Sequence, residues 1–542
     1  MPASIMPFQA TLRAGLKLLS LLQRVQTKRI KSMESQTAAP AHLDEHWFGH
    51  PKGLYFCFLT EMWERFSYYG MRALLVFYLT QHFLFGDSEA YLIFGAYASL
   101  VYMAPVIGGA LADKYLGMRK SVTFGAILLV IGHFGMALEG PAAELLAGEV
   151  VRNGFFTQVF YLSLAFIVVG VGFLKPNIST IVGELYPQND PRRDAGFTIF
   201  YMGINIGAFT ASLLCGWLGQ TYGWKYGFGL AGIGMLFGLL VFLQGQKHFN
   251  GAAESSKPEL LKEKLSLGLC REHLIYLSAI GMVLVAWQLV QHQAVVGGVL
   301  GLTAVAAIAF ILFYAFKKCT PEERDRLGVA SILIIFSVVF WALFEQAASS
   351  LNIFADRAVD RSIFGWEVPA AMLQSINPAI IFLFAPFVSM LWPKLAARGI
   401  EPNTPQKFAI AILLVGLGFL SLVLGGSMSE GGRIALFWIF LIYWFHTMGE
   451  LCLSPVGLSM ITKLSVRRIV SLMMGVWFLA SSGAHYIAGL IAVATSSEPE
   501  AGQTAVEVTL EVYAKVGWLA VAIALILFFA SPLLKKGMHG VS

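Results

Sequence analysis

The feature that most constrains this 542-residue chain is a series of apolar runs, each long enough to cross a lipid bilayer. Clear examples lie within residues 90–112, 272–290, 294–316 and 507–534. A helix needs about 20 apolar residues to span the hydrocarbon core, because it rises only about 1.5 Å per residue. Only 13% of the residues are charged, whereas soluble domains carry about 25%. The sequence therefore predicts an all-α integral membrane protein.

The segments between these runs carry positive charge unevenly. We place fourteen membrane-spanning helices at residues 53–84, 90–112, 120–139, 157–183, 195–220, 224–245, 272–290, 294–316, 328–355, 369–393, 404–425, 433–462, 468–495 and 507–534. Most of the 38 Lys and Arg residues then fall in alternate loops, which the positive-inside rule assigns to the cytoplasm. This predicts a multi-pass protein of the inner (plasma) membrane with both termini in the cytoplasm. The net charge of +6 reflects that topology, so no nucleic-acid partner is expected.

The sequence lacks the motifs of the common enzyme and metal sites. Its five cysteines are scattered and have no CxxC spacing, so we expect neither a disulfide nor a metal site. It contains no P-loop, GxSxG or HExxH motif. Glycine clusters such as residues 232–238 lie within spans, where close helix packing explains them. We therefore expect no cofactor, no bound metal and no enzymatic activity.

The order of the spans indicates two halves. A polar stretch follows the sixth span, two spans of low charge come next, and six more spans follow. We assign residues 1–46 to an N-terminal cytoplasmic tail, 47–245 to a six-helix bundle, 246–327 to a linker with two extra helices, and 328–537 to a second six-helix bundle. Two such halves are typical of a transporter whose site lies between them near the bilayer midplane. Residues 1–32 are basic and amphipathic, and they either lie on the inner leaflet or precede a natural start at Met33.

The segment EMWERFSYYGMR places charges in the middle of the first span. It presents five polar side chains within about 100° of one helical face: Glu61, Glu64, Arg65, Tyr68 and Arg72. A charge at the bilayer centre costs at least ~2.5–3.5 kcal/mol on insertion scales, so each such group is a functional candidate. The alternative is a self-neutralised structural cluster. We favour function because two carboxylates beside one guanidinium leave a carboxylate free to take a proton.

Polar side chains also recur in five other spans. They are Tyr102 in the second span, Lys175 in the fourth, Tyr201 and Asn205 in the fifth, Trp341, Glu345 and Asn352 in the ninth, and Glu450 and Ser454 in the twelfth. The first half thus supplies interior cations and the second half interior carboxylates, which can pair across the bundles as a gate. Three histidines lie within predicted spans that have no acidic residue in register with them on the same helix: His133, His446 and His485. We interpret them as packing or hydrogen-bonding residues. Trp477 is a candidate pocket wall.

These residues resemble the motifs of the proton-dependent oligopeptide transporter (POT/PTR) family, within the major facilitator superfamily. The first-span segment matches the family's ExxERFxYY element and its following arginine, and GGALADKYLGMRK matches the superfamily loop between spans two and three. FLKPNIS, FYMGINIGAF, FWALFEQ, QSINP and GELCLSP stand in the expected order, so the resemblance covers about residues 47–535. It implies the major facilitator fold. The plan of six, two and six helices is similar to the bacterial branch.

The resemblance also implies a role for each matching residue. Proton coupling is expected from Glu61, Glu64, Arg65, Lys175 and Glu345. Substrate contacts are expected from Tyr68, Tyr69, Arg72, Tyr102, Lys175, Tyr201, Asn205, Trp341, Glu345, Asn352, Glu450, Ser454 and Trp477. The expected partners are the peptide carboxylate for Arg72 and Lys175, the peptide amino terminus for Asn205, Asn352 and Glu345, and peptide side chains for Trp341 and Trp477. The implied cross-bundle gate pairs are Arg72 with Glu345 and Lys175 with Glu450.

The implied function is proton-coupled symport that imports di- and tripeptides by alternating access. Its partners would be peptides, protons and the lipid bilayer, and the functional unit a monomer. Animal members of the family carry a titratable histidine on the second span, which this sequence lacks, so coupling should depend on carboxylates. The alternatives are the same fold moving another small anion such as nitrate, or a nutrient sensor. A membrane enzyme would need catalytic groups that are not visible.

Overall fold

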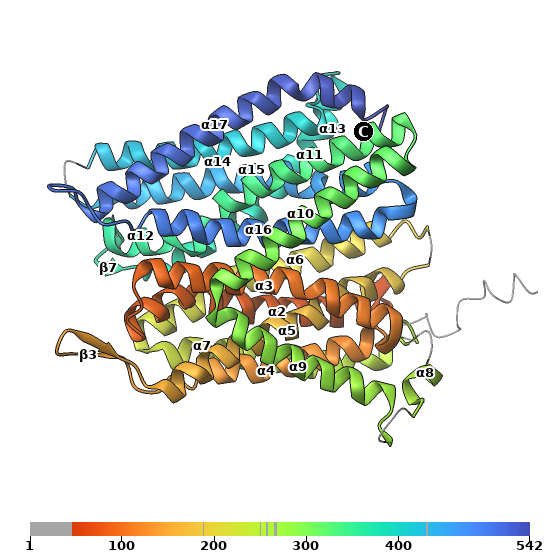
Figure 1. Cartoon of the computed structure of the whole chain (residues 1–542), viewed down its shortest axis with the longest axis horizontal. Helices are drawn as coiled ribbons and strands as arrows, with labels where there is room; N and C mark the ends of the chain where they lie inside the picture. The colour runs from red at the N-terminus through yellow and green to blue at the C-terminus, as the bar shows by residue number, and fades with distance from the viewer. Residues whose placement is uncertain are drawn as a thin grey trace, which may run out of the picture.

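The computed structural model describes residues 46–187, 189–249, 251–255, 258–264, 268–429 and 432–541 (Figure 1). The described chain is mostly helical and contains fourteen helices of 19 residues or more. This confirms the predicted all-α membrane fold. The predicted N-terminal tail, residues 1–46, lies outside the described residues except for His46.

Six long helices form the first bundle, the lower one in Figure 1. They are α2 (Lys52–Phe77), α3 (Asp87–Leu111), α4 (Met118–Met136), α5 (Gly154–Glu184), α6 (Arg193–Tyr222) and α7 (Trp224–Gly245). A π-helical turn continues each of the first two: η1 (Tyr78–His82) follows α2 and η2 (Ala112–Leu116) follows α3. A short 3-10 segment, η3 (Gln246–His248), follows α7.

The second bundle, the upper one in Figure 1, also has six long helices. They are α11 (Pro321–Phe344), α13 (Ile376–Ala397), α14 (Thr404–Ser427), α15 (Leu436–Leu464), α16 (Val470–Ala494) and α17 (Ala505–Gly537). The 3-10 turn η5 (Glu345–Ala348) interrupts the span that begins with α11, and α12 (Ser350–Ala358) completes it. Two further 3-10 segments, η6 (Ala370–Ser375) and η7 (Arg467–Ile469), precede α13 and α16. The interruption matters because Glu345 begins it.

Short strands form four two-stranded sheets in the connections between helices. Three sheets are antiparallel: β1 (His46–Trp47) with β2 (His50–Pro51), β3 (Glu144–Leu146) with β4 (Glu149–Val151), and β6 (Ser362–Ile363) with β7 (Trp366–Glu367). The fourth pairs β5 (Val359–Asp360) in parallel with β8 (Ile434–Ala435). No residue of these strands lines the cavity described below, so helical segments position its side chains.

Two further long helices connect the bundles. After the short α8 (Pro258–Lys262), α9 (Arg271–Gln291) packs against α5 and α3 of the first bundle. The next helix, α10 (Gln293–Lys318), contacts α16 and α11 of the second bundle. Many of their large apolar side chains are exposed, as expected for surfaces that face lipid. The pair therefore bridges both halves from outside.

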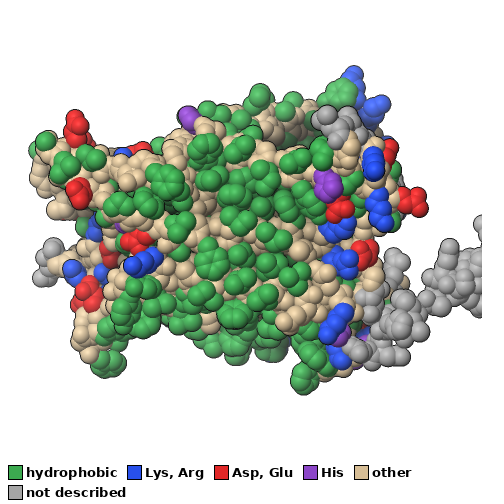
Figure 2. All heavy atoms as spheres, turned by 90° about the horizontal axis from the view of Figure 1, so that it is seen from below, with side chains coloured by type: hydrophobic (Ala, Val, Ile, Leu, Met, Phe, Trp, Pro, Cys, Tyr) green, Lys and Arg blue, Asp and Glu red, His purple; other side chains and the backbone are tan. Residues whose placement is uncertain are grey.

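The surface has the pattern of a membrane protein. On the face in Figure 2, hydrophobic side chains cover the middle and charged side chains gather at both ends. Twelve helices in the described chain are long and apolar enough to cross a membrane by composition alone. The long helices outside that set are α2, which carries the charged segment, and α4.

Fourteen spans are an even number, so α2 begins and α17 ends on the same side of the membrane, referred to below as the termini side. The opposite end is the far side.

Candidate functional site

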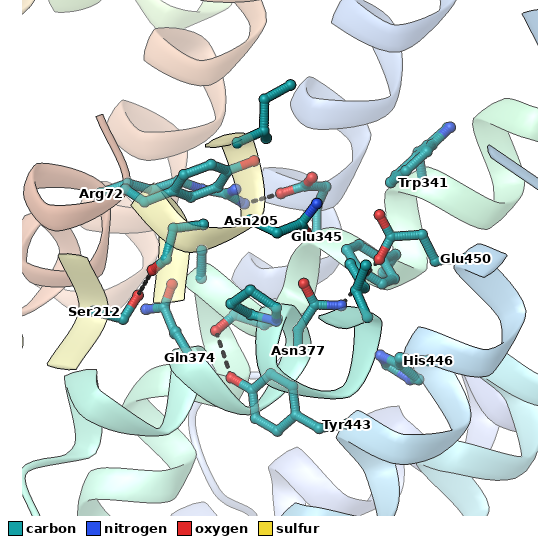
Figure 3. Close-up of a pocket in the computed structure, with 18 of the residues that line it drawn as sticks. Arg72, Asn205, Ser212, Trp341, Glu345, Gln374, Asn377, Tyr443, His446 and Glu450 are labelled. Atoms are coloured by element: carbon teal, nitrogen blue, oxygen red, sulfur yellow. Dashed lines mark hydrogen bonds and ion pairs between the residues drawn. The ribbon is translucent and has the colours of Figure 1, made fainter. Parts of the chain in front are cut away.

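A cavity lies between the bundles and is lined by both (Figure 3). Its volume is about 140 Å³, so in this conformation it is smaller than a typical small-molecule site of ~300–1,000 Å³. Eight predicted site residues line it: Tyr69, Arg72, Tyr102, Tyr201, Asn205, Trp341, Glu345 and Glu450. Its charged side chains are one guanidinium and two carboxylates, so cationic and anionic groups face each other across one space.

An ion pair between Arg72 and Glu345 joins the two bundles at the cavity wall. Arg72 comes from α2 and Glu345 from η5, and both residues are buried, at 8% and 4% exposure. The guanidinium also lies 5.9 Å from the ring centroid of Tyr69, a cation–π distance. Neither charge can turn to water in this conformation, so the pair holds α2 against the second bundle.

Glu450 lies elsewhere in the cavity, on α15. Its Oε2 accepts a hydrogen bond of 2.9 Å from Asn377 Nδ2, and the same amide lies 3.0 Å from Thr447 Oγ1. This fixes the carboxylate without neutralising it. An amide partner leaves Glu450 able to accept a further hydrogen bond from a cationic ligand.

The charged segment of α2 forms a separate cluster, on the termini side of Arg72 along the helix. Arg65 Nε lies 3.1 Å from Glu61 Oε1 and contacts Glu64 as well. All three residues are at most 4% exposed. One oxygen of each carboxylate has no hydrogen-bond partner in the described chain. The cluster therefore has spare hydrogen-bond acceptor capacity.

Lys175 approaches the cavity from α5. Its Nζ lies 4.2 Å from the ring centroid of Tyr102. Among the described side chains it forms no ion pair within 4.0 Å with Glu450, so this predicted gate pair is not assembled in this conformation. The pairing stays a prediction about another conformation.

Other predicted contact residues lie outside the cavity lining. Asn352 donates a hydrogen bond of 3.1 Å to the Ala73 carbonyl oxygen, across the bundle interface. Ser454 lines a second chamber towards the termini side, and Tyr68 is buried with its ring 5.5 Å from the Arg65 guanidinium. Trp477 packs against Gly457 of α15.

Sequence reasoning missed several polar groups of the site. Gln374, Asn377 and Tyr443 line the cavity although no role was assigned to them. The QSINP motif contains the first two, so it was the available signal. His485 was assigned to packing or hydrogen bonding because its own span offers no acidic neighbour in register, but its Nε2 lies 3.3 Å from Glu345 Oε1 of another span. Register within one helix could not reveal this contact, since the two residues lie on α16 and η5.

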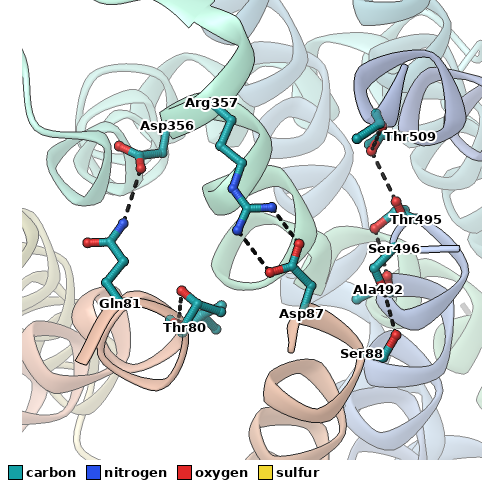
Figure 4. Close-up of polar contacts among 12 residues, drawn as sticks. Thr80, Gln81, Asp87, Ser88, Asp356, Arg357, Ala492, Thr495, Ser496 and Thr509 are labelled. Atoms are coloured by element: carbon teal, nitrogen blue, oxygen red, sulfur yellow. Dashed lines mark hydrogen bonds and ion pairs between the residues drawn. The ribbon is translucent and has the colours of Figure 1, made fainter. Parts of the chain in front are cut away.

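The far side of the cavity is closed by contacts between the bundles (Figure 4). Arg357 donates two hydrogen bonds to Asp87, of 2.5 and 2.9 Å. Further contacts are Gln81 to Asp356 at 3.3 Å, Ser88 to Ser496 at 2.8 Å, and Ser99 to Ser482 at 2.8 Å, and the Arg72–Glu345 pair lies deeper in the same seal. Gly95 of α3 and Gly489 of α16 allow the helices to touch, because a Cβ on Gly95 would lie 3.0 Å from the Gly489 Cα.

Towards the termini side the interior continues instead of closing. A second chamber shares Tyr201, Ile204, Ile381 and Glu450 with the central cavity and extends along α6, α13 and α15. Two bundles, a charged cavity between them and, among the described residues, a seal on the far side alone define a secondary transporter, in a conformation open towards the termini side.

Comparison with known proteins identifies the family. The model of the POT family matches residues 119–510, and the chain belongs to this family. It is 37% identical to the uncharacterized transporter YclF of Bacillus subtilis over 526 residues, covering 94% of this chain and 99% of that one. It is also 37% identical to the peptide transporter YePEPT of Yersinia enterocolitica, covering 85% of this chain and 90% of that one.

Solved structures agree with that assignment. A peptide transporter POT mutant in complex with alafosfalin superposes with a TM-score of 0.79 at 35% identity, covering 93% of this chain and 99% of that one. A POT family transporter in complex with 5-aminolevulinic acid gives a TM-score of 0.76 at 33% identity, covering 90% and 98%. These matches confirm the two-bundle transporter fold.

Proposed function

We propose that this protein is a proton-coupled symporter that imports di- and tripeptides by alternating access. The observation that carries the proposal is the cavity between the bundles, where Arg72 lies on one wall and Glu345 and Glu450 on the other. A peptide has a cationic amino terminus and an anionic carboxylate, so such a cavity can bind both ends at once. Relatives named as peptide transporters, among them a di-/tripeptide transporter of Lactococcus lactis, support the same substrate class.

Fixed end sites explain both a length limit and a broad side-chain tolerance. Each added residue lengthens an extended peptide by ~3.3–3.6 Å, so two end sites accept only short peptides. Hydrogen bonds to charged groups contribute ~1.5–3 kcal/mol each. A methylene-sized difference in a side-chain pocket is worth only ~1–3 kcal/mol. The ends therefore dominate recognition, and side chains modulate it.

Proton coupling follows from the excess of buried carboxylates in both halves. Glu61 and Glu64 share Arg65 in the first half, and Glu345 holds Arg72 from the second. Protonation of any of these carboxylates weakens its ion pair and thereby favours movement of the bundles. The driving force is ~2.3 kcal/mol per charge per 100 mV, plus ~1.4 kcal/mol per pH unit.

The charges of the cavity do not favour a small anion as cargo. Arg72 is already paired with Glu345, and Glu450 adds a second carboxylate. A ligand such as nitrate would meet a cavity with more negative than positive side chains. A peptide brings its own cation to the second carboxylate and suits the site better.

We further infer that the transporter works as a monomer in the inner (plasma) membrane with both termini in the cytoplasm. The termini side is then the inside, and the structure corresponds to an inward-facing conformation. The moving units would be residues 47–245 and 328–537. The two extra helices within residues 246–327 would act as a scaffold, because they pack on the outside of both bundles.

Uptake in proteoliposomes tests the proposal. Purified protein should concentrate a labelled dipeptide such as Ala-Ala when the external medium is acidic, and only equilibrate it when the pH is equal on both sides. Nitrate and N-acetylated, C-amidated dipeptide should not compete. Equal accumulation with and without the gradient would refute proton coupling, and competition by nitrate would favour the anion alternative.

A further inference from the structure

His485 of α16 lies at the closed seal between the bundles, with one side of its ring against Tyr102 and one nitrogen against Glu345. It is buried, at 3% exposure. Its Nε2 lies 3.3 Å from Glu345 Oε1, and its Nδ1 lies 2.8 Å from the Ser481 carbonyl oxygen. The ring stacks on Tyr102 of α3, with centroids 4.1 Å apart and planes at 27°.

Both ring nitrogens of His485 face hydrogen-bond acceptors. A carbonyl oxygen only accepts hydrogen bonds, so Nδ1 carries a hydrogen towards Ser481. An ionised carboxylate also only accepts, so a neutral ring would present the lone pair of Nε2 to Glu345. A proton on Nε2 removes that conflict and creates a charge-assisted contact. The position of His485 is therefore one at which a proton can be bound between two acceptors.

Glu345 thus has two possible cationic partners on different bundles. Its Oε2 is paired with Arg72 from α2, and its Oε1 faces His485 from α16. Arg72 moves with the first bundle, whereas His485 belongs to the same bundle as Glu345. When the bundles separate on the far side, only the partner in its own bundle can stay with the carboxylate.

We propose that His485 is a positioning residue for proton coupling: when protonated it pairs with Glu345 and so releases Arg72. The released guanidinium can then bind a peptide carboxylate, and Glu345 keeps a cationic partner while the seal is open. The proton enters on Nε2 from outside water while the seal is open and leaves to the inside after the seal has reformed, when Glu345 pairs with Arg72 again. This role rests on the proposed peptide symport and adds an imidazole to a mechanism otherwise carried by carboxylates.

The surroundings of the ring allow this role. The charged or titratable groups around it are Glu345 from η5, Arg72 from α2 beyond that carboxylate, Tyr102 from α3, and Lys175 from α5 on the same tyrosine ring. Helices α10, α11 and α15 also contact α16, but in the described chain they place no ion-pairing side chain on His485. Lys175 opposes the added charge, whereas Glu345, 3.3 Å from Nε2, stabilises it.

Two variants separate a proton-binding role from a packing role. His485→Gln keeps a polar side chain but cannot titrate, and His485→Lys places a permanent charge near Glu345. His133→Gln is the matched control, because His133 is a fully buried histidine on α4 with no hydrogen-bond partner in the described chain. Each protein is reconstituted and assayed for counterflow exchange of labelled dipeptide and for accumulation driven by a pH gradient.

We expect parent protein and His133→Gln to accumulate peptide and to bind it at least three-fold more tightly at pH 5.5 than at pH 7.5. His485→Gln should retain exchange within about three-fold of the parent, lose at least ten-fold in accumulation, and show a flat pH profile of binding. His485→Lys should exchange peptide with an equally flat profile. Either variant alone is sufficient to distinguish a proton-binding role of His485 from a packing role.

A variant at His485 that keeps the pH profile and accumulation of the parent would overturn the proposal. So would equal loss of exchange and accumulation in a variant that purifies as a folded protein, because a packing role predicts that result. Failure of the parent itself to accumulate dipeptide would instead refute the proposed function. The two failures are therefore distinguishable.

Discussion

The seal on the far side contains two ion pairs of very different burial. The side chains of Arg72 and Glu345 are 10% and 5% exposed, whereas those of Arg357 and Asp87 are 53% and 24% exposed. Removing one partner of a buried pair costs about 3–5 kcal/mol, because it leaves an uncompensated charge. An exposed pair is worth about 0.2–1 kcal/mol. Glu345→Gln should therefore open the far side much more than Asp87→Asn.

The size of the two effects follows from those energies. A factor of ten in an equilibrium corresponds to about 1.4 kcal/mol. A cost of about 3 kcal/mol in the closed conformation, relieved when water reaches Arg72 in the open one, raises the open fraction roughly 100-fold. Loss of the exposed pair raises it by no more than about five-fold. Both substitutions exchange a carboxylate for an amide of the same shape, so each serves as the control for the other.

Thiol labelling from outside measures the open fraction. Ile353 is 3% exposed and lines a cleft on the far side, so Ile353→Cys reports opening there. The two half-buried native cysteines, Cys270 and Cys319, are replaced by serine in the background, and the other three are buried. The rate of reaction with a membrane-impermeant maleimide is compared in cells. Equal acceleration by both substitutions, or none by Glu345→Gln, would refute the reasoning that burial sets the strength of the seal.

Three further predictions concern coupling, recognition and the second gate. Glu61→Gln or Glu64→Gln should abolish accumulation along a pH gradient but keep counterflow exchange; accumulation equal to the parent would exclude that carboxylate from coupling. Arg72→Ala should weaken binding of free dipeptides at least ten-fold more than that of C-amidated ones, as measured by calorimetry, and equal losses would point to gating instead. Lys175→Ala combined with Glu450→Ala should show a coupling energy of ~0.5–3 kcal/mol in exchange rates; strict additivity would mean that the two never meet.

The sequence alone determined the class of fold. Apolar runs predict the spans because the bilayer leaves a chain few alternatives to a helix. Inside the bilayer every backbone hydrogen bond must be made within the protein, and a helix makes all of them within its own segment. The same physics makes the charges of residues 61–72 conspicuous, because a buried charge without a function would be costly. Helical periodicity also places Glu61 and Arg65 one turn apart on one face, and their side chains lie 3.1 Å apart in the structure.

Only the tertiary structure decided which helix faces contact each other. Periodicity assigns a side chain to a direction within its own helix, but not to a partner helix or a depth along it. His485 was interpreted from α16 alone, yet it contacts Glu345 because packing of α16 against η5 brings them to the same depth. Asn352 shares a helical register with Glu345, but the 3-10 turn between them directs its amide to the Ala73 carbonyl oxygen and away from the cavity. These contacts depend on how separate helices associate in lipid. Close packing and interhelical hydrogen bonds control that association, and the periodicity of the sequence does not reveal it.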